Sequence, residues 1–224
     1  VLASWRQSCQ QSWGFWACLL MLEAATLGVL TATDLILFFF CWELTLPPIA
    51  LLVARWGIGP QRVFAATQYT LLMLFGGAAL LMAIALLALN HAEVHQGQLS
   101  FSLPVLLETP IAANLQAIVL LLLGLAFAIK APLPPFHHWL STLAMQAPPV
   151  LTAMLLGMKL GVYGIVRLLI PLLPEAVATY RGAISVWALV AVLYAALLAI
   201  RQHNLRSVLA YASVSHVGLV VLAL

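Results

Sequence analysis

Four ionisable side chains stand inside long apolar segments of this chain: Glu43, Lys130, Lys159 and His216. A charge within membrane hydrocarbon costs at least ~2.5–3.5 kcal/mol on insertion scales, so each such residue needs a partner or a function. One acid and two amines on separate segments suit the passage of a proton from group to group. Two unit charges about 4 Å apart interact by about 4 kcal/mol at an effective dielectric near 20, which is enough to decide where the proton resides.

Glu43 lies near the middle of the apolar segment DLILFFFCWELTLPPIALLVA, residues 34–54. Two prolines follow it closely. Pro47 cannot donate to the carbonyl of Glu43, and Pro48 likewise leaves the carbonyl of Leu44 free. Unpaired carbonyls beside a buried acid favour the entry of water, so we interpret Glu43 as a functional group.

Lys130 ends the apolar run LLLLGLAFAIK and is followed by APLPP. The prolines must stop or break a helix just past the lysine. At membrane depth, unwound backbone survives only where protein or a water-filled cavity covers it. The sequence therefore predicts a broken transmembrane helix, about residues 112–147, with a polar path beside it.

Lys159 is central in the apolar segment from residue 149 to about 170. Glycines flank it and allow another helix or water to approach closely; they are Gly157, Gly161 and Gly164. His216 follows Ser213 and Ser215, and a serine-rich turn with an imidazole can hold water.

The histidines and cysteines predict no haem and no metal site. His137 and His138 are adjacent, so on a helix they point about 100° apart and cannot ligate one ion together. The three cysteines share no metal-like spacing and are interpreted as packing residues; they are Cys9, Cys18 and Cys41.

The composition is that of an integral membrane protein. Of 224 residues, 65% are hydrophobic and only 7% are charged, whereas soluble domains carry about 25% charged residues. The formal net charge of +3 gives no support to nucleic-acid binding. Because the chain does not begin with methionine and stops within an apolar run, we expect it to be a fragment of a longer protein.

The apolar pattern predicts seven membrane spans. They cover about residues 13–33, 34–54, 63–89, 112–147 (broken), 149–170 and 183–200, with a seventh beginning near residue 205. Two short loops, RWGIGPQR and RQHNLR, carry arginines and are expected on the same, cytoplasmic face; these arginines are Arg55, Arg62, Arg201 and Arg206. The acid-only loop 91–110 falls opposite, whereas Arg167 runs against the rule.

Five stretches in order resemble the antiporter-type, proton-pumping membrane subunits of respiratory complex I and its photosynthetic relatives, particularly the chain 4 type. The family also includes the large subunits of Mrp-type sodium/proton antiporters. The matching stretches are DLILFFFCWELTLPPIALLVARWG (34–57), AFAIKAPLPPFHHWL (126–140), QAP (146–148), KLGVYGIVRL (159–168) and HNLRSVLAYASVSHVG (203–218).

The resemblance implies an all-α integral membrane fold, an antiporter-like inverted repeat of five-helix bundles. Residues 1–180 would form the first repeat and 181–224 the beginning of the second. By the family pattern, Glu43 and Lys130 form a glutamate–lysine pair and Lys159 is the next proton carrier. His216 leads into the second half-channel, and His137 is the histidine retained after the break.

The chain departs from the family pattern HxWLPDAH, since it reads HHWLSTLA. Ser141, Thr142 and Ala144 replace the usual proline, aspartate and second histidine. Gln146 and Lys159 are also about two residues closer together than in the family. Proton entry from the loop side is therefore expected to differ.

The resemblance implies a proton-translocating, non-redox subunit (a translocase) of a complex I-type NAD(P)H or ferredoxin:quinone oxidoreductase. It would hold no cofactor itself, while quinone, flavin and iron–sulfur clusters would lie in partner subunits. The expected partners are other membrane subunits and the lipid of a bacterial inner or cyanobacterial thylakoid membrane, and no nucleic acid. Two alternatives stay open: an Mrp-type cation/proton antiporter subunit, and a divergent structural subunit that has lost pumping.

Overall fold

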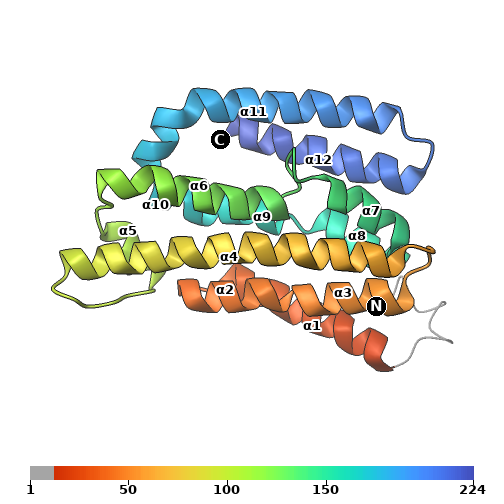
Figure 1. The fold of residues 1–224 in the computed structure, drawn as a ribbon, viewed down its shortest axis with the longest axis horizontal. Coiled ribbons are helices and arrows are strands. Elements are labelled where there is room, and N and C mark those ends of the chain that lie inside the picture. The colour runs from red at the N-terminus through yellow and green to blue at the C-terminus, as the bar shows by residue number, and fades with distance from the viewer. Residues whose placement is uncertain (1–12) are drawn as a thin grey trace.

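The computed structural model describes residues 13–224 and has the expected all-α membrane architecture. Within residues 13–224, seven helical segments are long and apolar enough to cross a membrane. They lie side by side with their axes roughly parallel (Figure 1). The chain is a multi-span membrane protein.

The helices in chain order are α1 (Trp13–Thr31), α2 (Leu35–Leu44), α3 (Leu46–Trp56), α4 (Arg62–Val94), α5 (Leu103–Glu108), α6 (Ala113–Lys130), α7 (His138–Gln146), α8 (Pro149–Gly157), α9 (Leu160–Gly164), a π-helical stretch (Ile165–Leu169), α10 (Ile170–Leu172), α11 (Pro174–Ile200) and α12 (Leu205–Ala223). The second span consists of α2 and α3, and the fifth runs from α8 to α10.

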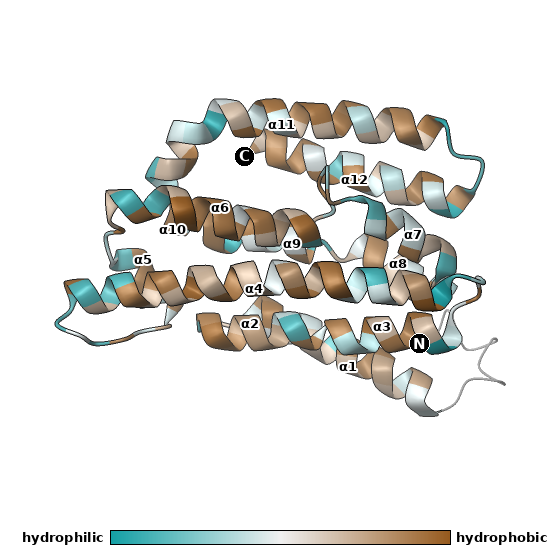
Figure 2. Ribbon diagram, viewed as in Figure 1, coloured by the Kyte–Doolittle hydropathy of each residue, from teal (hydrophilic) through white to brown (hydrophobic). Residues whose placement is uncertain are grey.

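Hydrophobic side chains cover the outside of the bundle as well as its interior. Most of α11 is hydrophobic in the view of Figure 2, and Leu197 and Ile200 on this helix are exposed. A helix that is apolar all round is typical of a membrane span. The core between the helices is also apolar, and α2, α4, α6 and α9 all contribute to it.

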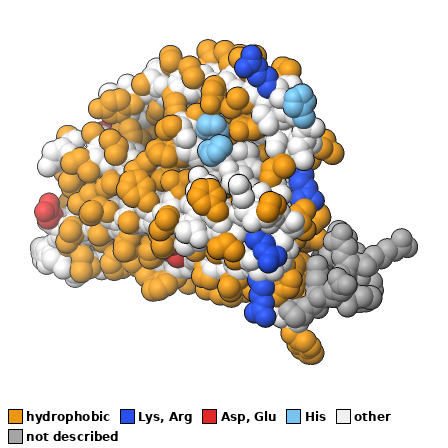
Figure 3. All heavy atoms as spheres, turned by 45° about the vertical axis from the view of Figure 1, so that its right-hand side comes forward, with side chains coloured by type: hydrophobic (Ala, Val, Ile, Leu, Met, Phe, Trp, Pro, Cys, Tyr) orange, Lys and Arg blue, Asp and Glu red, His pale blue; other side chains and the backbone are white. Residues whose placement is uncertain are grey.

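The two arginine-bearing loops lie at the same end of the bundle, as predicted, and the loop after α4 lies at the other end (Figure 1). Arg206 donates to the carbonyl of Ala147 at 3.3 Å, and the backbone N–H of Gln61 donates to the Gln146 side chain at 3.1 Å. Both loops are thus tied to the end of α7. Lys and Arg side chains gather toward this end on the face shown in Figure 3. Its cytoplasmic orientation remains a prediction.

The broken helix is confirmed, and its freed backbone groups have partners. Because Pro132 cannot donate to Ala128, that carbonyl accepts from the backbone N–H of Leu133 instead, at 2.9 Å. The indole N–H of Trp139 donates to the Ile129 carbonyl at 2.9 Å. A second indole, that of Trp187, donates to the Pro134 carbonyl at 2.8 Å. These bonds satisfy backbone that would otherwise be stranded in an apolar interior.

Two helix boundaries differ from those expected. Helix α4 has 33 residues. It continues past the expected end at residue 89 through the segment HAEV, which favours a helix although it is not apolar. Helix α11 begins at Pro174 because proline is well suited to the first turn of a helix. The proposed repeat boundary at residue 180 thus falls inside α11, and the division into two repeats remains a prediction.

The fifth span is also not the continuous helix expected. It breaks at Met158 and Lys159, where no proline marks the sequence, and Lys159 has φ −99° and ψ 46°. A second interruption therefore lies next to the one that follows Lys130.

Candidate functional site

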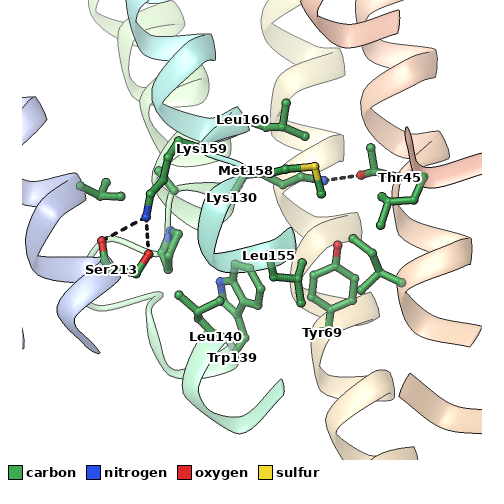
Figure 4. A pocket seen from close by; sticks show the side chains of 15 residues that line it. Thr45, Tyr69, Lys130, Trp139, Leu140, Leu155, Met158, Lys159, Leu160 and Ser213 are labelled. Atoms are coloured by element: carbon green, nitrogen blue, oxygen red, sulfur yellow. Dashed lines mark hydrogen bonds between the residues drawn. The ribbon is translucent and has the colours of Figure 1, made fainter. Parts of the chain in front are cut away.

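A small internal cavity lies where the two helix breaks face each other. Its volume is about 30 Å³, which suffices for one or two water molecules. Apolar side chains form most of the wall, including those of Trp139 and Leu155 (Figure 4). Polar side chains enter the wall from five of the spans: Thr45, Tyr69, Lys130, Lys159 and Ser213.

The Lys130 ammonium group is held by Thr45. Lys130 Nζ donates to Thr45 Oγ1 at 2.7 Å. The Thr45 hydroxyl is buried and donates its own proton to the Trp42 carbonyl at 2.8 Å, so it is free to accept from the amine. The Trp42 ring adds a cation–π contact, since Lys130 Nζ lies 4.9 Å from its centroid.

Glu43 lies close to this group but is not bonded to it. Within residues 13–224, the Lys130 ammonium forms no ion pair with the Glu43 carboxylate. The carboxylate instead rests against α4, where a Cβ added to Gly77 would lie 2.7 Å from Glu43 Cδ. The expected direct contact is thus replaced by the threonine, and the functional role of the pair remains a prediction.

Lys159 occupies the other side of the cavity, at the break between α8 and α9. Its ammonium group donates to the Ser213 hydroxyl and lies 3.4 Å from the Ser213 carbonyl. Figure 4 shows the two lysine amines pointing in opposite directions, one toward Thr45 and one toward Ser213. A proton passing between the amines would have to cross the cavity.

Glycines bring the two breaks together. A Cβ on Gly161 would lie 2.7 Å from Ala131 Cα, and one on Gly164 would lie 2.6 Å from the Phe127 ring. Helix α9 therefore packs closely on the end of α6, as the glycine spacing predicts. Gly157 faces open space instead.

The adjacent histidines after the break point to different surroundings. The buried His137 ring packs edge-on against Tyr194 at 5.3 Å between centroids and lies 6.0 Å from Tyr211. Its Nδ1 atom is buried without a hydrogen-bond partner in the described chain. His138 is exposed and lines a polar cleft of about 330 Å³ at the arginine-loop end. Tyr211 borders both places, since it also lines the cleft and its hydroxyl is hydrogen-bonded to that of Ser141 at 3.3 Å.

His216 does not share the cavity with the lysines. Its side chain is exposed on α12, whereas Ser213 on the same helix faces the cavity. Among the predicted groups, the structure thus brings Lys130 and Lys159 to one cavity with Glu43 nearby. It places His137 in a separate aromatic cluster and leaves His216 on the surface of the described chain.

The cysteines pack within or beside the bundle where they are described. Cys41 lies against Gly28, whose added Cβ would stand 3.2 Å from Cys41 Cβ. Cys18 is half-buried. Cys9 lies outside the described residues.

Sequence reasoning missed two groups of this site. Thr45 lies two residues after Glu43 and before the two prolines, and this position in the sequence could have marked it as part of the site. Tyr211 gave none, because an aromatic residue in an apolar helix is ordinarily a packing residue.

Comparison with known proteins assigns the family. Residues 32–224 match the family model described as NADH:quinone oxidoreductase/Mrp antiporter, transmembrane. The chain belongs to this family. The match covers both lysines, Glu43 and both helix breaks.

Relatives in this NADH:quinone oxidoreductase/Mrp family are longer proteins. The chain is 34% identical over 231 residues to NADH-quinone oxidoreductase subunit M of Escherichia coli, covering 100% of this chain and 45% of that protein. It is 36% identical over 226 residues to NAD(P)H-quinone oxidoreductase chain 4 2 of Thermosynechococcus vestitus, covering 100% of this chain and 41% of the relative. The chain thus spans less than half the length of these curated relatives.

Two solved structures of family assemblies share the fold. A chain of respiratory complex I from Thermus thermophilus with bound NADH superimposes with a TM-score of 0.82 at 33% identity, covering 91% of this chain and 43% of that one. A chain of the Mrp complex from Dietzia sp. DQ12-45-1b gives a TM-score of 0.81 at 25% identity, covering 93% of this chain and 22% of that one. The antiporter-like fold expected from the sequence is therefore confirmed.

Proposed function

We propose that this chain conducts protons as a membrane subunit of a complex I-type NAD(P)H or ferredoxin:quinone oxidoreductase. The observation that carries the proposal is the placing of two amines, Lys130 and Lys159, on opposite walls of one water-sized cavity. The family membership supports the same function. Quinone, flavin and iron–sulfur clusters would belong to partner subunits, in a bacterial inner or thylakoid membrane.

In the proposed path, the Lys130 amine moves between two partners. In one position it is bonded to Thr45 and faces the cavity. In the other it approaches Glu43, whose negative charge stabilises the ammonium form. Moving the amine away from the carboxylate weakens that stabilisation and releases the proton toward water in the cavity.

Lys159 receives the proton on the far wall. Ser213 accepts from its ammonium group through both the hydroxyl and the carbonyl oxygen, so the charged form has partners after the transfer. Because the two amines point away from each other, the transfer would need water in the cavity to carry the proton between them. The proton then leaves toward α12, where the family pattern has His216.

Entry from the arginine-loop end would use the polar cleft beside His138. Tyr211 lines that cleft and also packs near His137. The family's aspartate and second histidine are absent here, and Ser141 with Tyr211 supplies hydroxyl groups in that region. This hydroxyl route is the part of the path that differs from the family pattern.

The test is proton transport by the assembled complex in liposomes. Lys130→Met should abolish most quinone-dependent acidification while the complex still assembles, because Met keeps the length of the side chain and removes its proton. Arg201→Met, at an exposed loop position, is the control and should pump normally. Normal pumping by Lys130→Met in a fully assembled complex would rule out the path and favour a structural subunit.

An Mrp-type antiporter component is the second candidate, because the Mrp complex shares the fold. The two functions differ in what accompanies the chain. Purification from its native membrane with flavin or iron–sulfur subunits supports the oxidoreductase. Transport driven by a sodium gradient in their absence supports the antiporter.

A further inference from the structure

Two histidines stand one helical turn apart at the C-terminal end of α4, far from the cavity. In the sequence HAEVH, His91 lies in the last turn and His95 follows the helix. Residues four apart share a helix face. Their rings are stacked, with centroids 4.1 Å apart and planes inclined by 19°. Paired histidines at this spacing are the arrangement by which helices commonly bind zinc.

The hydrogen bonds around His91 fix its tautomer. The Thr109 hydroxyl donates its only proton to the Val105 carbonyl at 2.9 Å. Toward His91 Nδ1, 2.7 Å away, that oxygen can therefore only accept. Nδ1 of His91 accordingly carries the hydrogen, and Nε2 keeps a free lone pair.

The same argument applies to His95. Its Nδ1 lies 3.2 Å from the backbone carbonyl of His91, which can only accept. Nδ1 thus carries the hydrogen here too. Neither Nε2 atom has a hydrogen-bond partner among residues 13–224. Histidines that bind metals typically donate their other ring N–H to an oxygen in this way.

The site is held in place and reaches water. The side chain of Asn90 donates to the Pro110 carbonyl at 3.0 Å and accepts from the Ala112 N–H at 3.1 Å. It thereby fixes the segment that carries Thr109. With 33 residues, α4 is about 50 Å long, whereas the hydrocarbon of a bilayer is about 30 Å thick. Its last turn therefore extends to the membrane surface, where His95 is exposed and His91 is buried behind it.

We propose that His91 and His95 bind a divalent transition-metal ion, of the zinc or copper class, through their two Nε2 atoms. At a metal–nitrogen distance of about 2.0–2.1 Å, two adjacent ligand nitrogens lie about 3 Å apart. Because the two rings are stacked nearly parallel, metal binding requires the exposed His95 ring to tilt so that its Nε2 atom and that of His91 face one ion. Water completes the coordination, since residues 13–224 contain no group of three or more His, Cys, Asp or Glu side chains placed to hold a metal. This site departs from the expectation that the chain binds no metal.

The experiment is metal titration of the full-length protein in detergent, with Zn²⁺ alone followed by calorimetry and Cu²⁺ alone followed by electron paramagnetic resonance. His95→Ala should weaken binding at least tenfold and remove one nitrogen from the copper spectrum. Thr109→Val should weaken binding about tenfold or more, and Thr109→Ser should restore it. His203→Ala, at an exposed histidine in the loop after α11, is the matched control and should bind as the wild type.

The proposal fails if His95→Ala binds both ions with unchanged affinity, or if His203→Ala loses as much. It also fails if Thr109→Val binds like the wild type, because the ring orientation would then not depend on the hydroxyl. Circular dichroism of each variant shows whether the helices are retained. Proton transport is not a readout, so the outcome is independent of the proposed function.

Discussion

The hydroxyl of Thr45 is the most specific target for a test of the lysine path. Thr45→Val keeps the shape of the side chain and removes the hydroxyl that accepts from Lys130 at 2.7 Å. A hydrogen bond to a charged group contributes about 1.5–3 kcal/mol. At about 1.4 kcal/mol per factor of ten, the cavity-facing position of the amine loses roughly 10–100-fold in population, and proton transport should fall accordingly.

Initial rates of acidification in liposomes containing the assembled complex measure this effect. Thr45→Ser retains the hydroxyl and should stay within about twofold of the wild type. Thr67→Val removes the same group at an exposed site on α4, where it bonds only to the Val63 carbonyl at 3.0 Å, and should have no effect. Transport by Thr45→Val at the wild-type rate would refute the reasoning, as would an equal loss in Thr45→Ser.

Two further substitutions test the surroundings of the cavity. Gly77→Ala places a methyl group 2.7 Å from Glu43 Cδ and must displace the carboxylate, so transport in the same assay should fall by up to about a hundredfold. The control is Gly157→Ala, which adds its methyl group in open space and should leave transport unchanged. Equal transport by the two variants would contradict this prediction. Trp139→Phe leaves the Ile129 carbonyl without its donor at 2.9 Å and should destabilise the protein by about 1–3 kcal/mol. The loss is measured as a lower thermal unfolding midpoint in detergent. An unchanged midpoint would mean that water replaces the indole.

The sequence predicts those parts of the fold that depend on local chemistry. The break after Lys130 follows from prolines that cannot donate, and the spans follow from length and apolarity. The break at Lys159 has no such local signal. It became visible only with the packing of Gly161 against Ala131, which is a contact between two spans.

In the candidate site, too, the local sequence predicts some features, whereas others depend on tertiary contacts. Residue type and depth identify Lys130 and Lys159, because a buried amine is conspicuous in an apolar segment. The partner of each amine is a tertiary property, and so Thr45 was not foreseen in place of Glu43. At the end of α4 the spacing of His91 and His95 was visible in the sequence. The tautomer of His91 depends on Thr109, which a loop and a short helix bring back to α4.

The two indole bonds at the break after Lys130 have a mechanical consequence. Trp139 and Trp187 fasten the unwound backbone from two different helices, and releasing either strands a carbonyl in an apolar interior. The two bonds therefore oppose bending of the backbone at this break and keep it rigid. If the chain transports protons as proposed, these bonds favour a cycle in which the lysine side chains move over a few ångströms and the helix itself does not swing.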